Sequence, residues 1–151
     1  MLGQMMDVPL QISSILQHAA RHHSDAQIVT RRVEGDIHRY TYADCERRSR
    51  QLGDGLAQLG MQPGDRIGTL AWNTYRHMEL YYGVGGMGSI IHTINPRLHP
   101  DQIAWIIGHA EDKLLAFDLT FLPIIEAIAA HCPTVKGWIA MTDRAHMPAT
   151  T

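Results

Sequence analysis

The chain has 151 residues, 45% of them hydrophobic and 19% charged, so it can form one domain with a sizeable core. The formal net charge of −2 offers no positive field for nucleic acid, and two isolated cysteines, Cys45 and Cys132, exclude a disulfide framework. No stretch approaches the roughly 20 apolar residues of a membrane span, and the N-terminus lacks the basic start of a signal peptide. We therefore expect a cytoplasmic protein without a membrane span.

The first third of the sequence predicts a helix, a β-hairpin and a second helix. Apolar residues recur with helical spacing over residues 10–22. Two short strand candidates, residues 26–32 and 37–41, lie on either side of a Glu-Gly-Asp turn and predict the hairpin. The second helix, over about residues 42–59, opens with a capping-box pattern in which Asp replaces the usual Glu or Gln.

From Arg66 onward, strand patterns alternate with helix patterns. The expected strands cover residues 66–72, 89–94, 113–118 and 136–141, and the expected helices cover residues 75–86, 101–110 and 121–131. Such a β-α-β-α-β-α-β series favours a parallel sheet with right-handed crossovers and helices on both faces. The predicted fold class is α/β, a doubly wound parallel sheet with flanking helices and an N-terminal β-hairpin.

Residues 83–88, GVGGMG, match the glycine pattern of a dinucleotide-binding loop. That loop must follow a strand and open a helix, because the helix N-terminus supplies the amide donors for the pyrophosphate. Here the glycines close a predicted helix and precede a strand. Their order favours a packing role, in which small residues let the helix lie close to its neighbours.

Two clusters of polar residues invite a binding interpretation. His18 and His22 are four residues apart on one predicted helix, next to His23, and could share a zinc ion, but no carboxylate or cysteine completes the set. Six arginines between residues 31 and 50 could bind phosphate, but acidic residues are interleaved with them. A solvated polar face is the favoured interpretation of both clusters.

His92 and the Trp72-Asn73 pair could each belong to a binding site, but a structural role explains each of them at least as well. His92 in a predicted strand is expected to have a hydrogen-bond partner rather than a metal. Trp72-Asn73 follows a predicted strand at the edge where ligands of parallel sheets gather, yet a cap for the next helix is favoured there. No phosphate-binding G-x-x-x-x-G-K-[ST] loop and no complete catalytic constellation occurs in the sequence.

Several motifs in combination resemble the N-terminal region of adenylate-forming acyl-CoA synthetases, over roughly residues 8–143. They are TYAD at the start of a helix, LG-x-x-PGDRI before a strand, WNTYRHMELYYG-x-x-GMG, HTINPRL and HAEDK. The form most similar to this sequence is the medium- to long-chain fatty acyl-CoA synthetase branch.

The resemblance implies an enzyme that uses ATP and Mg²⁺ to convert a fatty acid to an acyl-adenylate, and then transfers the acyl group to coenzyme A. Family members are several times longer than this chain. Their phosphate loop, adenine-binding motif, hinge and C-terminal catalytic lysine have no counterpart here. Residues 1–151 are therefore expected to be an N-terminal subdomain without catalytic residues or metal ligands, inactive alone and without a tightly bound cofactor.

One binding residue is implied by the resemblance. In related CoA ligases the arginine of the N-P-R-L loop can lie near the phosphates of the CoA nucleotide, and the matching position is Arg97. A guanidinium suits phosphate by its charge and its forked donors. The alternative is an ordinary loop arginine that pairs with an acid such as Asp101. A second functional hypothesis is a non-catalytic assembly module, because the N-terminal region of related synthetases helps to form a homodimer.

Overall fold

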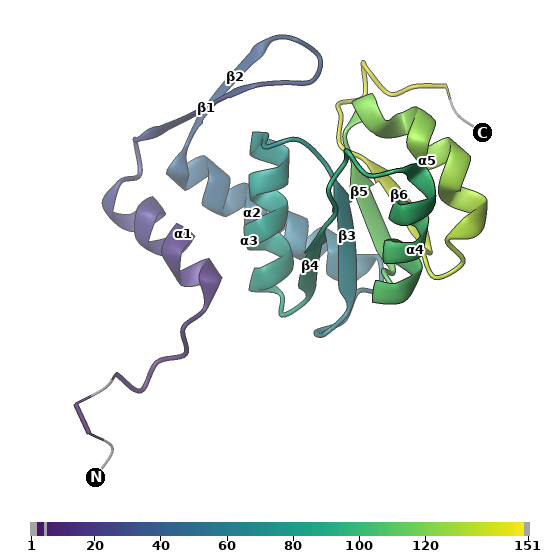
Figure 1. The fold of residues 1–151 in the computed structure, drawn as a ribbon. Coiled ribbons are helices and arrows are strands. Elements are labelled where there is room, and N and C mark those ends of the chain that lie inside the picture. The colour runs from purple at the N-terminus through teal and green to yellow at the C-terminus, as the bar shows by residue number, and fades with distance from the viewer. Residues whose placement is uncertain (1–2, 5, 150–151) are drawn as a thin grey trace.

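The chain forms a four-stranded parallel sheet between helices, with a separate two-stranded hairpin near one end (Figure 1). This computed structural model describes residues 3, 4 and 6–149. The elements in chain order are α1 (Ile12–His22), β1 (Gln27–Arg31), β2 (Ile37–Thr41), α2 (Tyr42–Gln58), β3 (Arg66–Leu70), α3 (Tyr75–Gly86), β4 (Ile90–Thr93), α4 (Pro100–Ala110), β5 (Leu114–Phe117), α5 (Leu122–Ile128) and β6 (Gly137–Ala140). Short 3₁₀ turns, Leu119–Phe121 and Ala129–His131, flank α5.

The strand order β4-β3-β5-β6 makes the sheet doubly wound. All three neighbouring pairs are parallel, and β3 lies between β4 and β5. The chain therefore passes from β3 to β4 on one side and returns to β5 on the other side. The crossover directions diverge between β3 and β5, and this point is the topological switch point of the sheet.

Each face of the sheet carries its own core because side chains alternate along the strands. Ile67 and Leu114 pack beneath α2 and α3, together with Leu56, Leu80 and Val84 from the helices. Residues whose side chains point to the opposite face, including Leu70 and Leu115, pack beneath α4 and α5. The predicted α/β fold with helices on both faces is confirmed.

The N-terminal elements form a third cluster against α3. The hairpin pairs Gln27 with Thr41, and Thr41 caps α2 through a reciprocal capping box with Asp44, as predicted. Leu16 of α1, Tyr40 of β2, Cys45 of α2 and Tyr75 of α3 form the buried centre of this cluster. Among the described residues, no helix is both long enough and apolar enough to cross a bilayer.

The glycine run at residues 83–88 lies at the C-terminal end of α3, as its sequence order predicts. A Cβ atom on Gly83 would lie 2.8 Å from the backbone oxygen of Ser49 on α2. A Cβ atom on Gly85 would lie 3.0 Å from the Cγ2 atom of Ile12 on α1. The packing interpretation is confirmed, because these glycines let α3 lie against both helices.

The segment after β6 has more structure than its sequence pattern suggests. Glu34 of the hairpin turn accepts hydrogen bonds from Arg76 of α3 (2.9 Å) and from Thr142 (2.8 Å). Arg32 donates to Asp143 at 3.0 Å. These bonds join the hairpin, the start of α3 and the segment after β6 across more than a hundred residues of sequence. Little in the local sequence indicates such a pairing.

Candidate functional site

The candidate site lies at the carboxyl ends of β3 and β5, at the topological switch point. Open parallel sheets bind their ligands in the crevice at this point, because neighbouring loops diverge there. The chain leaves β3 through Trp72 and Asn73, which we call the Trp72–Asn73 corner. Both residues are exposed, and the Trp72 ring packs against Phe121 with its centroid 5.1 Å away.

Two buried polar side chains hold this exposed corner by its backbone. Asp118, which follows β5 and is fully buried, accepts a hydrogen bond from the Trp72 N–H at 2.7 Å. His77, in the first turn of α3, lies with Nδ1 3.2 Å from the Trp72 carbonyl oxygen, so Nδ1 carries the proton and donates. The Thr69 hydroxyl lies 3.1 Å from the Nε2 atom of His77 and donates to it. The corner is thus fixed on both sides of Trp72.

Burial sets the charge states of these two residues. It lowers the pKa of His77 below its usual value, and this keeps the imidazole neutral and preserves both of its hydrogen bonds. Burial also raises the pKa of Asp118, although the bond from Trp72 opposes the shift. The Oδ1 atom of Asp118 has no hydrogen-bond partner among the described residues. Burial of a polar atom is costly when it has no hydrogen-bond partner.

The start of α3 lacks the predicted side-chain cap. Thr74 is the N-cap residue, with extended backbone angles, but its side chain makes no capping hydrogen bond. Its hydroxyl is buried and without a partner among the described residues, and Asn73 beside it is exposed. The cap expected in this segment is therefore located at Thr74, one residue after Asn73, and it forms without a side-chain hydrogen bond.

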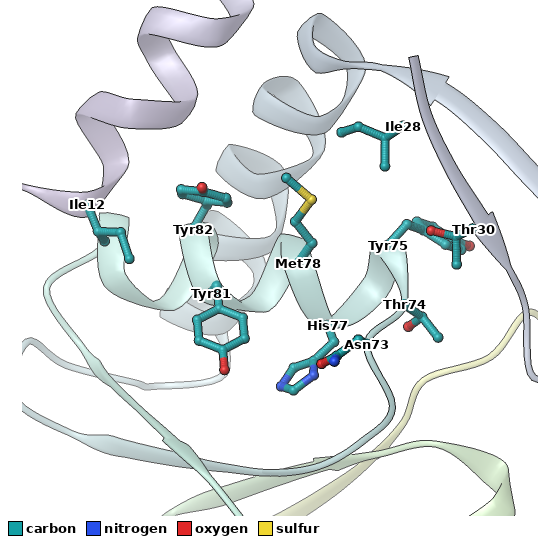
Figure 2. Close-up of a pocket in the computed structure, with 10 residues that line it drawn as sticks. All are labelled: Ile12, Ile28, Thr30, Asn73, Thr74, Tyr75, His77, Met78, Tyr81 and Tyr82. Carbon is teal, nitrogen blue, oxygen red and sulfur yellow. The ribbon is translucent and has the colours of Figure 1, made fainter. Parts of the chain in front are cut away.

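A pocket of about 440 Å³ extends from this corner along the side of α3 (Figure 2). Its polar end is formed by Asn73 and Thr74, and its walls come from α3, α1 and β1. The wall residues are Ile12, Ile28, Thr30, Tyr75, His77, Met78, Tyr81 and Tyr82. The lining exposes mostly apolar surface, and none of these ten residues is Asp, Glu, Lys or Arg. Its size lies within the range of about 300–1,000 Å³ that is typical of small-molecule sites.

Arg97, the residue that the family resemblance implies, lies on the exposed loop after β4, the strand beside β3. Its backbone N–H donates to the Asn95 side chain at 3.0 Å. Its guanidinium pairs with no carboxylate within the described part of the chain, whereas the carboxylate of Asp101 lies 3.5 Å from His99. The guanidinium is therefore free for an anionic ligand. Contact with CoA phosphates stays a prediction.

The other predicted clusters lie at the surface. His18 and His22 lie on the exposed side of α1 with their ring centroids 4.5 Å apart and their ring planes tilted by 41°. The arginines between residues 31 and 50 largely pair with acids, as in Arg48–Glu79 and Arg47–Asp44, so the mixed polar surface is confirmed. The hydrogen-bond partner expected for His92 is the buried carboxylate of Asp112.

His92 of β4 and Asp112 before β5 form a hydrogen-bonded pair. Their Nδ1 and Oδ2 atoms are 2.8 Å apart, and Asp112 is fully buried. Burial raises the pKa of Asp112, while the bond to His92 opposes that shift. Within residues 3, 4 and 6–149, the group of three potential metal ligands is Glu34, Asp143 and His146. Arginines already bind both carboxylates of that group, which leaves little room for a cation.

Asp118, His77 and Thr74 are not among the site residues that the sequence predicts. An acidic residue directly after the strand pattern KLLAF was the available signal for Asp118, because it marks the carboxyl edge of the sheet. The partners of His77 depend on how α3 packs over β3, which local sequence does not encode. The fold defines an α/β protein, and these residues lie at the switch point, the place where open parallel sheets generally bind ligands.

Comparison with known proteins gives the family. A family profile described as "AMP-binding enzyme" matches residues 16–149, so the chain belongs to the AMP-binding enzyme family. It is 49% identical, over 95% of its length, to a 3-methylmercaptopropionyl-CoA ligase of Ruegeria lacuscaerulensis. It is 46% identical, over 93% of its length, to a medium-chain-fatty-acid–CoA ligase of Ectopseudomonas oleovorans. The resemblance to acyl-CoA synthetases is confirmed.

The chain spans about a quarter of the length of these relatives, 27% of the first and 26% of the second. A solved structure of the N-terminal domain of FACL13 from Mycobacterium tuberculosis superposes with a TM-score of 0.78 at 26% identity. That match covers 93% of this chain and 37% of the solved domain. The chain therefore corresponds to part of the N-terminal domain of an adenylate-forming enzyme.

Proposed function

We propose that residues 1–151 are the N-terminal subdomain of a cytoplasmic, ATP-dependent fatty acid–CoA ligase. The complete enzyme would form an acyl-adenylate from the acid and ATP, with Mg²⁺, and then transfer the acyl group to CoA. The observation that carries this proposal is the 46–49% identity to two acid–CoA ligases over nearly the whole chain. The relatives act on different acids, so the acid itself is left open.

The isolated chain is proposed to be inactive because it lacks a binding site for a polyphosphate. Phosphate loops present several backbone N–H groups and a lysine to the ligand. The glycine run of this chain is instead packed against α1 and α2, and no lysine lies within it. Arg97 is a candidate contact for CoA phosphates from the edge of the sheet, and the remaining phosphate contacts would come from the rest of the enzyme.

Acid-dependent pyrophosphate release tests this proposal. The chain is assayed alone and as a chimera in which it replaces the matching residues of the Ruegeria ligase. Both are given ATP, Mg²⁺, CoA and either 3-methylmercaptopropionate or decanoate. The chimera should turn over and the chain alone should not. Turnover by the chain alone, or a folded chimera without activity on either acid, would contradict the proposal. The unaltered Ruegeria ligase and its remainder without the chain are the controls.

A second candidate function is a non-catalytic assembly module that forms a homodimer. Exposed apolar side chains favour it: Leu10 is 99% exposed and Ile15 is 61% exposed on the N-terminal segment. The outer edge of β4 also has no partner strand among the described residues, and such edges invite pairing. Sedimentation of the isolated chain tests this function, and a monomer at high concentration would count against it.

A further inference from the structure

Two histidines lie side by side at the surface of α1. His18 and His22 are about one helical turn apart, and their ring centroids are separated by 4.5 Å. Both residues are exposed, so packing does not fix the orientation of either ring. Sequence alone favours a solvated face here. Both descriptions hold, because an exposed pair of imidazoles is also open to a metal ion.

The separation of the two rings suits a shared metal ion. Zinc binds an imidazole nitrogen at about 2.0–2.1 Å, so two imidazoles on one tetrahedral ion have their ring centroids about 5 Å apart. The observed 4.5 Å, with ring planes tilted by 41°, lies close to that value. A small rotation of the exposed side chains completes the geometry, because such side chains change rotamer readily.

The position on the helix also favours a cation. His22 lies in the last turn of α1, where carbonyl groups without intrahelical partners give the helix end a partial negative charge. Arg21 in the same turn opposes a cation, but it is exposed, so water and salt screen its charge. Imidazole ligands select transition-metal ions such as Zn²⁺, whereas Mg²⁺ prefers oxygen ligands.

His23, the next residue, does not belong to the pair. It is the C-cap residue of α1, with a non-helical φ of −136°, and its ring centroid lies 6.2 Å from that of His18. Among the described residues, no third potential ligand atom joins the pair as the side chains stand. Two protein ligands are fewer than the four of a structural zinc site, so the affinity is modest and water fills the other positions.

We propose that His18 and His22 chelate a divalent transition-metal ion, represented by Zn²⁺, across the last turns of α1. One nitrogen of each ring binds the ion. Neither histidine lines the pocket along α3, and the binding requires neither ATP nor CoA. The metal site can therefore hold whether or not the proposed ligase activity does.

Calorimetric titration of the complete chain, free of any affinity tag, with ZnCl₂ and MgCl₂ tests the proposal. Zn²⁺ should bind saturably, and Mg²⁺ should not saturate at the same concentrations. His18→Gln and His22→Gln should each weaken Zn²⁺ binding about tenfold or more, because the single remaining imidazole cannot chelate the ion.

His23→Gln is the matched control. It removes an exposed imidazole directly beside the pair and should change the Zn²⁺ affinity by less than about twofold. Circular dichroism verifies that the three variants fold, as expected for substitutions at exposed positions. Absence of saturable Zn²⁺ binding, equal binding of Mg²⁺, an unaltered affinity in His18→Gln or His22→Gln, or an equal loss in His23→Gln would overturn the proposal.

Discussion

The two ends of α3 differ in the way they use their polar backbone. At the C-terminal end, Gly83 and Gly85 bring the helix into contact with α2 and α1. At the N-terminal end, Thr74 and three N–H groups have no acceptor among the described residues, and a pocket opens beside them. A glycine-rich motif therefore marks tight helix packing here, and the polar groups without an acceptor lie at the end without glycines.

The largest change in stability is expected from the addition of a side chain at the C-terminal end of α3. Gly83→Val should destabilise the fold by about 3 kcal/mol, because its Cβ atom would meet the Ser49 carbonyl oxygen at 2.8 Å. Gly55→Ala on α2 is the matched control, since a Cβ atom there would have no neighbouring atom within 4 Å and α-helices favour alanine. It should stabilise the fold by about 0.5 kcal/mol. Urea unfolding of both variants measures the contrast, and equal effects would refute the packing argument.

The next effect concerns the buried carboxylate that holds the Trp72–Asn73 corner. Asp118→Ala leaves the Trp72 N–H without its acceptor and should cost about 2 kcal/mol. Asp118→Asn keeps an oxygen at that place and should remain within about 1 kcal/mol of the wild type, since it also removes the cost of a buried carboxylate. Chemical denaturation monitored by circular dichroism compares the two. If Asp118→Asn loses as much unfolding free energy as Asp118→Ala, the carboxylate charge and not the hydrogen bond stabilises the corner.

A smaller effect is expected from pH through His77. Burial lowers its folded-state pKa below the ordinary value of 6.5, so in the window between the two values the unfolded chain binds the extra proton. The stability that His77 contributes is complete above that window and is lost as the pH falls through it. Between about pH 7.5 and pH 5, the wild type should lose about 1 kcal/mol more than His77→Gln.

Urea unfolding at the two pH values measures this difference. His131→Gln, at an exposed position in the 3₁₀ turn after α5, is the control and should keep the pH dependence of the wild type. His38 of β2 is also buried in part with a lowered pKa, so some pH dependence should persist in His77→Gln. An identical pH dependence in His77→Gln and the wild type would exclude His77 as a contributor.

The smallest effect returns to the open end of α3. Thr74→Val introduces the same side chain as Gly83→Val, but here it replaces a hydroxyl that makes no hydrogen bond. Stability should change by less than about 0.5 kcal/mol, because no capping bond is lost. Thermal unfolding tests this expectation. A loss of about 1 kcal/mol, as is typical of a removed N-cap, would mean that Thr74 caps α3 in solution.

Periodicity and turn chemistry were sufficient to predict most of the fold. The capping box at Thr41 and Asp44 and the strand–helix alternation after Arg66 are local sequence patterns. In both cases the local structural preference agrees with the overall fold. The end of α3 at the glycine run is predictable for the same reason. The helix expected over residues 121–131 was too long, because its two ends tighten into 3₁₀ turns.

The site was less predictable because its key contacts are non-local. Asp118 and Trp72 are 46 residues apart, and only the parallel register of β3 and β5 brings them together. The failure of Thr74 to cap α3 cannot be derived from its residue type, which is among those most favoured at that position. Family resemblance supplied the position of Arg97 but no information about the pocket along α3.

The bonds that join the hairpin to the segment after β6 have a consequence for biosynthesis. The hairpin leaves the ribosome early, but Thr142 and Asp143, which bind its turn and its Arg32, are translated more than a hundred codons later. Until then Glu34 of the hairpin turn has Arg76 of α3 as its partner. Docking of the hairpin is thus completed by residues that are translated much later, and a translational pause between the two segments would leave the hairpin loosely attached.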